Sequence, residues 1–584
     1  MLDVYARDGA GRNARLRVGE RDTPLPGMLW HAGRLPPGAQ GWAPLLDTNP
    51  NPEALVLATT RFTEPAPVGS SDQLVLRRRL APTASMLESG VRLDLLGSHV
   101  AVWDTAYDLS KDAKPFAAAL ARARREAGFA RVLYAQGLGE PHTLAALVYA
   151  GVDLFDATPL LLAAAHGTYL TTDGRFDAAT LTESVCACPA CQDEAPSTFT
   201  TEEVAAHNQY AARTELGVVR NAIAAGRLRE LVEARVRAHP EQTALLRRLD
   251  AEYAAIEARA PIQRASTLHA NTKESLQRVE CRRFRERVRD RYRPPTSPPV
   301  LVLFPCSHRK PYSTSRTHRA FGDVIWSVGA AGLVHEVILT SPLGLVPREL
   351  ELTYPAAHYD VPVTGEWDEE EGTMIRGLLA NLLSKRSYAR VVSHLPRHTY
   401  DLVRGLLPDD TIVTCEGENA TAPEALKRLE LVLKQLGTEH RRVNLAQLQL
   451  ERLRAIADYQ FGPSVADALF EGAHVEGKWP TGKVFAGGEQ LAMLPTTRGL
   501  LSLTLAGARR VLDAGAYRVE IDDFRVKGGV FAVGVKGADP AIRPGDEVVV
   551  HHAGDLRAVG TALMSGPEMV ELKRGEAVNA RHHT

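Results

Sequence analysis

The sequence lacks the features of a membrane protein and of a disulfide-stabilised secreted domain. No window in its 584 residues holds the roughly 18 consecutive apolar residues that a transmembrane helix needs. Residues 1–20 lack the apolar core of a signal peptide. Six cysteines in so long a chain are too few for a disulfide framework. We therefore expect a soluble, cytoplasmic protein without a membrane partner, built from several domains of roughly 150 residues each.

The chain also has little net charge, with a formal value of −1 at pH 7. Bulk charge therefore gives no indication of nucleic-acid binding. The local exception is the stretch 278–293, RVECRRFRERVRDRYR, which is followed by PPTSPP. We interpret it as the solvated face of a helix that leads into a linker, and the alternative is a strip that contacts phosphates.

Strand and helix patterns alternate in two parts of the chain. In the first part, apolar strand patterns at 131–134 and 152–155 alternate with helix patterns at 116–127 and 143–150. This alternation favours a parallel sheet or a barrel. A second α/β unit begins at Val300, and its strands and helices are expected at 300–304, 319–329, 334–340, 369–383, 389–393 and 400–407.

The densest group of reactive side chains follows the apolar run 300–304. The stretch 305–318, PCSHRKPYSTSRTH, offers a thiol, two imidazoles, a lysine and a tyrosine. Functional loops of α/β proteins commonly lie past the carboxyl ends of strands. We therefore expect this loop to be the reactive centre, with Cys306 as a nucleophile. The alternative is that Cys306 is a small buried apolar residue.

Three cysteines are crowded into the motif CxCxxC, formed by Cys186, Cys188 and Cys191. Three thiolates at this spacing favour a tetrahedral metal, and zinc is the default. His207 is the nearest candidate for the fourth ligand of a structural Zn²⁺ site. The alternative is a reduced, metal-free cysteine cluster.

The first half of the chain resembles the tRNA-guanine transglycosylase family. The matching segments are VDLFD at 152–156, GTYLT at 167–171, the CACPAC motif, His207-Asn208 and NAIAAGRL at 221–228. The resemblance implies a zinc-bearing TIM-type barrel that exchanges a tRNA guanine for a 7-deazaguanine, with Asp156 in place of the covalent nucleophile. The family's second aspartate motif, DSGAF, is missing, and only about 150 residues precede Asp156. We therefore expect a truncated or degenerate barrel, in which Asp156 is a relic nucleophile or a capping or structural carboxylate.

The middle of the chain resembles the archaeosine synthase family. The motif PCSxxKPYxxS at 305–315 and a second cluster at 341–367, SPLGLVPRELELTYPAAHYDVPVTGEW, carry the resemblance, together with the domain order. The resemblance implies a tRNA-modifying transferase that adds an amine to the nitrile of 7-cyano-7-deazaguanine in the tRNA D-arm. It implies that the amine is the side chain of free lysine, or that glutamine supplies the nitrogen. It also implies a radical-SAM partner enzyme, while the resemblance to transglycosylases implies a homodimer.

This chemistry suggests roles for the loop. A thiolate adds to the nitrile carbon to give a thioimidate, which the amine displaces to form an amidine. The alternative is direct attack by the amine. Basic side chains would lower the pKa of the Cys306 thiol, a nearby donor would protonate the nitrile nitrogen, and carboxylates would hold the ammonium of the donor. The catalytic candidates are Cys306, Lys310, His318 and Tyr312, and the substrate-binding candidates are Ser307, Ser315, Glu349, Glu351, Tyr354 and Asp360.

The C-terminal segments resemble a PUA domain, which is a small RNA-binding β-barrel. The matching segments are 528–535, 543–548, 558–560 and 573–581. The candidate phosphate contacts are Arg525, Lys527, Lys573 and Arg574. The alternative is a dimerisation barrel without RNA.

These observations predict a multidomain α/β protein with a C-terminal β-barrel. The expected parts are a transglycosylase-like barrel with the zinc site at 1–270, an Arg/Pro-rich linker at 271–299, a catalytic α/β core at 300–420, a helix-rich α+β connector at 421–504 and a PUA domain at 505–584. The leading hypothesis is amine addition to a nitrile on tRNA. The alternatives are an active transglycosylase that inserts the base and a non-catalytic tRNA-binding scaffold for a partner enzyme.

Overall fold

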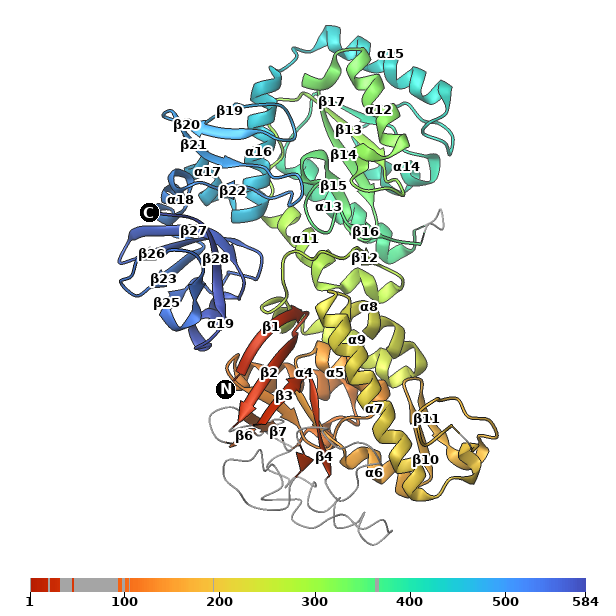
Figure 1. Ribbon diagram of the computed structural model, residues 1–584. Helices are drawn as coiled ribbons and strands as arrows, with labels where there is room; N and C mark the ends of the chain where they lie inside the picture. The colour runs from red at the N-terminus through yellow and green to blue at the C-terminus, as the bar shows by residue number, and fades with distance from the viewer. Residues whose placement is uncertain are drawn as a thin grey trace. The chain divides into compact units, whose positions relative to one another are not determined.

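The computed structural model describes residues 2–18, 21–31, 45–46, 93–96, 100–103, 105–192, 194–362 and 367–584. Two compact units are distinguished, Met1–Pro261 with Pro567–Gly575, and Ile262–Gly566 with Glu576–Thr584 (Figure 1). None of the helices in the described ranges has the length and apolar character needed to cross a membrane.

A six-stranded, mostly parallel sheet forms the core of the first unit. Its order is β5-β4-β9-β8-β7-β6, and only the β6–β7 pair is antiparallel. The strands are β4 (Gly27–His31), β5 (Leu45–Leu46), β6 (Leu93–Leu96), β7 (Val100–Trp103), β8 (Val132–Ala135) and β9 (Leu154–Asp156). Within the described ranges this sheet has six strands, whereas a complete TIM barrel has eight. The mixed α/β fold predicted for this part of the chain is confirmed.

Helices follow the strands of this sheet, as the β–α alternation predicts. Asp112 caps α4 (Ala113–Ala127) by accepting a hydrogen bond from Lys114 N. The next helices are α5 (Pro141–Tyr149) and α6 (Thr158–Ala165). A separate antiparallel sheet consists of β1 (Leu2–Asp8), β2 (Gly11–Val18) and β3 (Arg21–Leu25).

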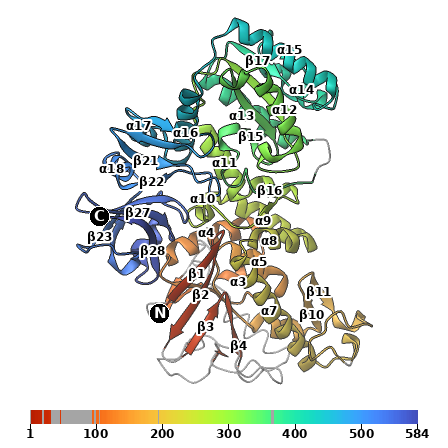
Figure 2. The same ribbon diagram turned by 45° about the horizontal axis from the view of Figure 1, so that its top comes forward.

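The second part of the first unit is helical and carries the cysteine motif. Helix α7 (Thr201–Ala224) begins with a capping box between Thr200 and Glu203. It packs against the hairpin of β10 (Thr168–Thr171) and β11 (Gly174–Asp177), as both views show (Figures 1 and 2). Helices α8 (Leu228–Arg235), α9 (Pro240–Ala251) and α10 (Tyr253–Glu257) complete the predicted helical region.

A five-stranded sheet is the core of the α/β domain in the second unit. Its order is β15-β14-β13-β17-β18, and only the β14–β15 pair is antiparallel. The strands are β13 (Val300–Pro305), β14 (Val334–Thr340), β15 (Gly344–Pro347), β17 (Arg390–Ser393) and β18 (Ile412–Val413). The run Val300–Phe304 is completely buried, as expected for the central strand of a parallel sheet. The helices are α12 (Arg316–Ser327), α13 (Glu369–Lys385) and α14 (Arg397–Val403).

The arginine-rich stretch is helical, as predicted, but two of its arginines are buried and not solvated. It forms helix α11 (Val279–Asp290), in which Arg283 and Arg287 are buried together with Phe284. The Arg287 guanidinium lies 3.8 Å from Asp546 and stacks over the Tyr459 ring at 5.7 Å. Burial of these arginines is possible because carboxylates and aromatic rings of distant segments surround them.

Two further sheets follow the α/β domain. A four-stranded antiparallel sheet follows α15 (Pro423–Glu439), α16 (Leu445–Phe461) and α17 (Pro463–Phe470). Its order is β19-β20-β21-β22, with β19 (His474–Glu476), β20 (Lys483–Ala486), β21 (Glu489–Met493) and β22 (Ser502–Leu503). Helix α18 (Leu505–Asp513) leads to a six-stranded sheet in the order β24-β28-β27-β26-β23-β25. Its strands are β23 (Arg518–Ile521), β24 (Val530–Phe531), β25 (Val535–Ala538), β26 (Glu547–His552), β27 (Asp555–Ala562) and β28 (Glu576–His583). The prediction that the C-terminal part of the chain consists mainly of β-strands is therefore confirmed.

Candidate active site and metal site

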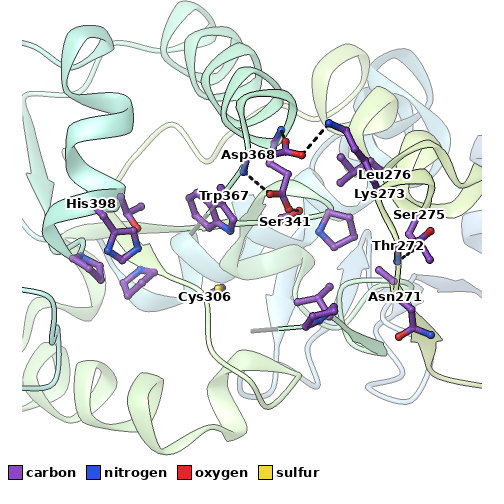
Figure 3. Close-up of a pocket in the computed structure, with 18 residues that line it drawn as sticks. Asn271, Thr272, Lys273, Ser275, Leu276, Cys306, Ser341, Trp367, Asp368 and His398 are labelled. Carbon is purple, nitrogen blue, oxygen red and sulfur yellow. Dashed lines mark hydrogen bonds and ion pairs between the residues drawn. The ribbon is translucent and has the colours of Figure 1, made fainter. Parts of the chain in front are cut away.

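Three loops that follow strands of the five-stranded sheet meet at its carboxyl edge. Cys306 directly follows the central strand β13, Ser341 follows β14, and His398 lies on α14 after β17. All three residues line one cavity of about 430 Å³ (Figure 3). This volume lies within the roughly 300–1,000 Å³ typical of small-molecule sites. The location matches the crevice at which open α/β sheets bind ligands.

A short parallel pair outside the main sheet supplies the opposite wall of this cavity. Strand β12 (Leu268–His269) pairs with β16 (Tyr359–Asp360). This pairing positions two segments. The segment after β12 contains Lys273, which lines the cavity, and the segment after β16 leads to Trp367 and the first turn of α13. The members of this wall are Ala270, Asn271, Thr272, Lys273, Ser275, Leu276, Val361, Pro362, Trp367, Asp368 and Glu371.

Cys306 belongs to a chain of hydroxyl groups. The Thr340 side chain at the end of β14 lies beside its thiol and lowers the pKa of that thiol. The Thr340 hydroxyl lies 2.6 Å from the Tyr359 hydroxyl, which in turn is hydrogen-bonded to the buried Tyr312 hydroxyl. Burial raises the pKa of Tyr312, and proximity to Cys306 raises it further. The phenol is therefore a neutral member of this chain at neutral pH.

Lys310 supplies the positive charge nearest to the thiol in the loop. Its ammonium lies over the Tyr359 ring, 4.1 Å from the centroid. Burial lowers the pKa of Lys310, while Cys306 and Asp360 oppose that effect. Burial also raises the pKa of Cys306, and the charge of Lys310 and the Thr340 side chain oppose this rise. The two shifts reduce the difference between the pKa values of the Cys306 thiol and the Lys310 ammonium. A proton can therefore exchange more easily between the two groups.

His318 lies on the opposite side of the loop from the cavity lining. It is buried at the start of α12, and its Nε2 donates a hydrogen bond to Pro305 O at 3.0 Å. Its Nδ1 accepts from Arg348 Nη2 at 2.9 Å. Burial lowers the pKa of His318 well below its usual range, and the Arg348 charge adds to this. The imidazole is therefore neutral and holds the backbone next to Cys306.

Two predicted substrate-binding residues also stabilise the loop from this side. Ser315 caps α12 by accepting a hydrogen bond from His318 N at 3.1 Å. Glu351 accepts from Ser313 N at 2.9 Å and from Arg348 Nη1 at 2.8 Å. Both residues are buried, and neither lines the Cys306 cavity.

The other predicted substrate-binding residues have varied environments. Glu349 is buried and accepts a hydrogen bond from the Tyr292 hydroxyl, with His335 Nε2 at 3.4 Å. Tyr354 is buried next to α11. Asp360 is exposed at the end of β16, 3.9 Å from His308 Nδ1, and Ser307 donates to Arg309 O at 3.1 Å. The structure thus brings Cys306, Lys310 and Tyr312 together and separates Glu349, Glu351 and Tyr354 from the cavity.

Sequence reasoning missed the carboxylates and the cation that line the cavity. Asp368 caps α13, and Glu371 closes the capping box. Lys273 begins a short 3-10 helix whose cap is Thr272. The pattern Asp-x-x-Glu before an apolar run is a recognisable helix start. It indicates where α13 begins, but it does not show that this turn borders Cys306.

The four predicted metal ligands converge in the first unit. The Sγ atoms of Cys186, Cys188 and Cys191 and the Nδ1 atom of His207 all lie within 4.8 Å of one another. A tetrahedral zinc site with bonds of about 2.3 Å places its ligands roughly 3.8 Å apart. His207 Nε2 lies 2.9 Å from Leu170 O and can donate to it, which leaves Nδ1 free to bind a metal. The donor set and its geometry therefore fit zinc.

Asp156 is at the carboxyl end of β9 and is completely buried. Its Oδ1 accepts from Thr158 N at 2.9 Å, at the first position of α6. Its Oδ2 accepts from Gly137 N at 2.6 Å and from the Tyr134 hydroxyl at 2.9 Å. Burial raises the pKa of Asp156, although these three bonds oppose the shift. This carboxylate joins two loops and the start of a helix.

The four candidate phosphate contacts are exposed. Arg525 and Lys527 lie in the loop between β23 and β24, and Lys573 and Arg574 lie in the turn before β28. Exposed arginine and lysine side chains in loops are suited to contact a phosphate backbone.

Four families match successive parts of the chain. Residues 101–241 match "Queuine tRNA-ribosyltransferase", and residues 281–433 match "Domain of unknown function (DUF5591)". Residues 451–517 match "Patch-forming domain C2 of tRNA-guanine transglycosylase", and residues 511–584 match "PUA domain". The catalytic-core candidate and the PUA-like module each coincide with one of these matches.

Curated relatives match over most of the chain. "Archaeosine synthase subunit alpha" of Methanosarcina acetivorans is 40% identical and covers 86% of this chain and 82% of its own length. "Archaeosine synthase" of Haloferax volcanii is 37% identical and covers 100% of this chain and 99% of its own length. The "tRNA-guanine(15) transglycosylase" of Methanothermobacter thermautotrophicus is 33% identical over 77% of this chain and 66% of its own length. The chain therefore belongs to the archaeosine synthase family and has a tRNA-modifying role in archaeosine biosynthesis.

Proposed function

We propose that this protein adds an amine to the nitrile of 7-cyano-7-deazaguanine in the D-arm of tRNA, and that Cys306 is its nucleophile. The observation that carries this proposal is the position of Cys306. Its thiol follows the central strand and lines a cavity at the carboxyl edge of the sheet. It is accompanied by Lys310 and by the hydroxyl chain through Thr340.

The reaction requires two additions and no external oxidant or reductant. The Cys306 thiolate attacks the nitrile carbon, a C–S bond forms, and the nitrogen takes a proton, which gives a thioimidate. The amine then attacks the same carbon and loses a proton, the C–S bond breaks, and the sulfur leaves as thiolate. The product is an amidine that contains all atoms of the nitrile and the amine.

Lys310 and the hydroxyl chain can move the protons. Transfer of the thiol proton to a neutral Lys310 amine gives a thiolate next to an ammonium. The ammonium can then protonate the developing anionic nitrogen. The Thr340 hydroxyl, which donates to Ser341 O at 3.1 Å, can turn to donate to the thiolate while Tyr359 donates to Thr340. His318 has a positioning role in this scheme, since it fixes the Pro305 carbonyl.

The remaining parts of the chain bind metal, RNA and partners in this proposal. Cys186, Cys188, Cys191 and His207 would hold a structural Zn²⁺, which ties the cysteine loop to helix α7. The PUA module would bind the tRNA through residues that include Arg525 and Lys527. We propose free lysine as the donor, a homodimer as the assembly, and a radical-SAM enzyme as the partner that converts the adduct.

Base exchange by the barrel is less well supported. Asp156 would have to attack a ribose carbon, yet it is completely buried and accepts three hydrogen bonds. Release of these bonds would leave a buried carboxylate without its partners Tyr134, Gly137 and Thr158. The geometry therefore favours the structural interpretation of Asp156.

Mass spectrometry of tRNA nucleosides tests the proposal. Nitrile-bearing tRNA is incubated with the protein and either lysine or glutamine. The expected result with lysine is a mass increase equal to one whole lysine, since the addition has no leaving group. A gain of only one nitrogen and its hydrogens with glutamine would instead indicate direct nitrogen transfer. An unchanged nucleoside mass with both donors would contradict the proposed activity.

A further inference from the structure

Two carboxylates and a lysine line the Cys306 cavity and have no part in the reaction steps above. Asp368 and Glu371 come from the first turn of α13, and Lys273 comes from the segment after β12 (Figure 3). Together, these three side chains have two negative charges and one positive charge. The wall formed by them therefore has a net negative charge near the thiol.

Glu371 is held in a fixed orientation but keeps capacity for a ligand. Its Oε1 accepts from Ser341 Oγ at 2.6 Å, and its Oε2 accepts from Asp368 N at 2.8 Å. Each carboxylate oxygen has a second lone pair. Within the described part of the chain, no ion pair neutralises Glu371. Glu371 can therefore accept hydrogen bonds from a cationic ligand without moving.

Lys273 is the cation on the same wall as the two carboxylates. Its Nζ lies 3.0 Å from Asp368 Oδ2, and both side chains are well exposed. An exposed pair of this kind contributes little to stability. A zwitterionic ligand can therefore insert between the two residues, with its cation on the carboxylate and its anion on the lysine.

We propose that Asp368, Glu371 and Lys273 form the subsite that recognises the amine donor as a free diamino acid. This proposal rests on the proposed function. Asp368 and Glu371 accept hydrogen bonds from the α-ammonium, and Lys273 binds the α-carboxylate. The apolar side chains of Leu276 and Pro342, which line the same cavity, pack along the methylenes. The second amine is thereby directed toward the carbon that Cys306 activates.

The charges of the subsite explain which donor it favours. Lysine has two ammonium groups and one carboxylate. The charges of its α-ammonium and α-carboxylate cancel, so the side-chain ammonium gives lysine a net positive charge. Glutamine has an uncharged amide in place of the second ammonium. A wall with net negative charge therefore favours lysine over glutamine.

Two lysine analogues test each half of the subsite separately. 6-Aminohexanoate lacks the α-ammonium, and 1,5-diaminopentane lacks the α-carboxylate. The wild-type protein is expected to prefer lysine over each analogue by at least about tenfold in kcat/KM, because each analogue leaves charged groups of the site without a partner. Adduct formation is measured by mass spectrometry of the tRNA nucleosides.

Variants are expected to lose one preference each. Glu371→Gln should reduce the preference for lysine over 6-aminohexanoate at least threefold and leave the preference over 1,5-diaminopentane unchanged. Lys273→Ala should reduce the preference for lysine over 1,5-diaminopentane at least threefold and leave the preference over 6-aminohexanoate unchanged. Glutamine at position 371 can still close the capping box, so α13 should keep its start. The KM for tRNA should not change in either variant.

Glu369→Gln is the matched control. Glu369 lies in the same turn of α13, but it is exposed, pairs with Arg376 and does not line the cavity. If wild-type protein forms the lysine adduct and the variants at 371 and 273 keep both preferences, the subsite is wrong while the proposed function stands. If wild-type protein forms no adduct with any amine, both are wrong.

Discussion

The ammonium of Lys310 lies 4.1 Å from the centroid of the Tyr359 ring, and the hydroxyl of the same ring lies 2.6 Å from Thr340 Oγ1. Tyr359 therefore touches both groups that set the protonation of Cys306. Its ring face holds the cation, and its hydroxyl is hydrogen-bonded to Thr340, which lies beside the thiol.

Two substitutions at Tyr359 separate these contributions. Tyr359→Phe keeps the ring under Lys310 and removes the hydroxyl, whereas Tyr359→Leu removes both. We expect the pKa of Cys306, measured from the pH dependence of iodoacetamide alkylation, to rise in both variants and to rise more in Tyr359→Leu. Equal profiles for wild type and both variants would show that Tyr359 only fills space.

Loss of the Lys310 charge should make the thiol less acidic. The charge of Lys310 lowers the pKa of Cys306 against the effect of burial. Lys310→Met should therefore move the midpoint of Cys306 alkylation to higher pH by about one unit. Lys310→Arg keeps the charge and serves as the control, with a smaller change expected. A lower midpoint in Lys310→Met would contradict the assigned electrostatics.

Metal content should depend on the four converging ligands. Purified wild-type protein should contain about one zinc per chain by elemental mass spectrometry, and Cys191→Ser should reduce this strongly and lower the melting temperature. Cys415→Ser, at a buried cysteine outside the site, should keep the zinc. Unchanged zinc in Cys191→Ser would show that the metal, if present, binds elsewhere.

Acid should destabilise the α/β domain through His394. This residue is buried after β17, and its ring nitrogens lie 2.8 Å from Thr414 Oγ1 and 2.8 Å from Ala420 O. Burial lowers the pKa of His394 to about 4. The unfolded chain takes up this proton near pH 6.5, whereas the folded protein resists it until about pH 4. Stability should therefore fall between these pH values, by about 3 kcal/mol in total for this group.

The comparison with His394→Gln isolates this contribution. Denaturant unfolding of the full chain at pH 7 and pH 5 should show a smaller pH effect in the variant, even if its stability at pH 7 is lower. An identical pH effect in both proteins would mean that other groups cause the acid sensitivity.

The PUA loop should contribute electrostatically to tRNA affinity. If Arg525 and Lys527 each contact a phosphate, the double alanine variant should bind tRNA more weakly and reduce the slope of log K against log salt by about 2. A double alanine variant at Lys427 and Lys434, which removes the same charge from α15, is the control. Equal salt slopes in wild type and the loop variant would exclude these contacts.

The sequence predicted the elements that depend on local patterns. The apolar run 300–304 became the central strand β13, and CxCxxC with His207 became a cluster of four converging ligands. In both cases the residues that define the feature are near one another in the sequence. The local pattern of residue types is therefore enough to predict the strand or the metal site.

The missed features depend on contacts between distant segments. The second wall of the cavity is positioned by β12 and β16, a pair only two residues long, which has no recognisable pattern in the sequence. The arginines of α11 are buried because Asp546 and Tyr459 reach them from far along the chain. His318 is neutral because it is buried and because Arg348, which follows β15, lies against it.

The most direct test of the central claim is the nucleoside mass of nitrile-bearing tRNA after incubation with lysine and Cys306→Ala protein. Cys281→Ala, at a buried cysteine of α11, is the matched control. We predict that Cys281→Ala forms the lysine adduct, while Cys306→Ala binds the tRNA with near wild-type affinity and forms none. Adduct formation by Cys306→Ala at a rate near that of wild type would contradict the role of Cys306 as the nucleophile.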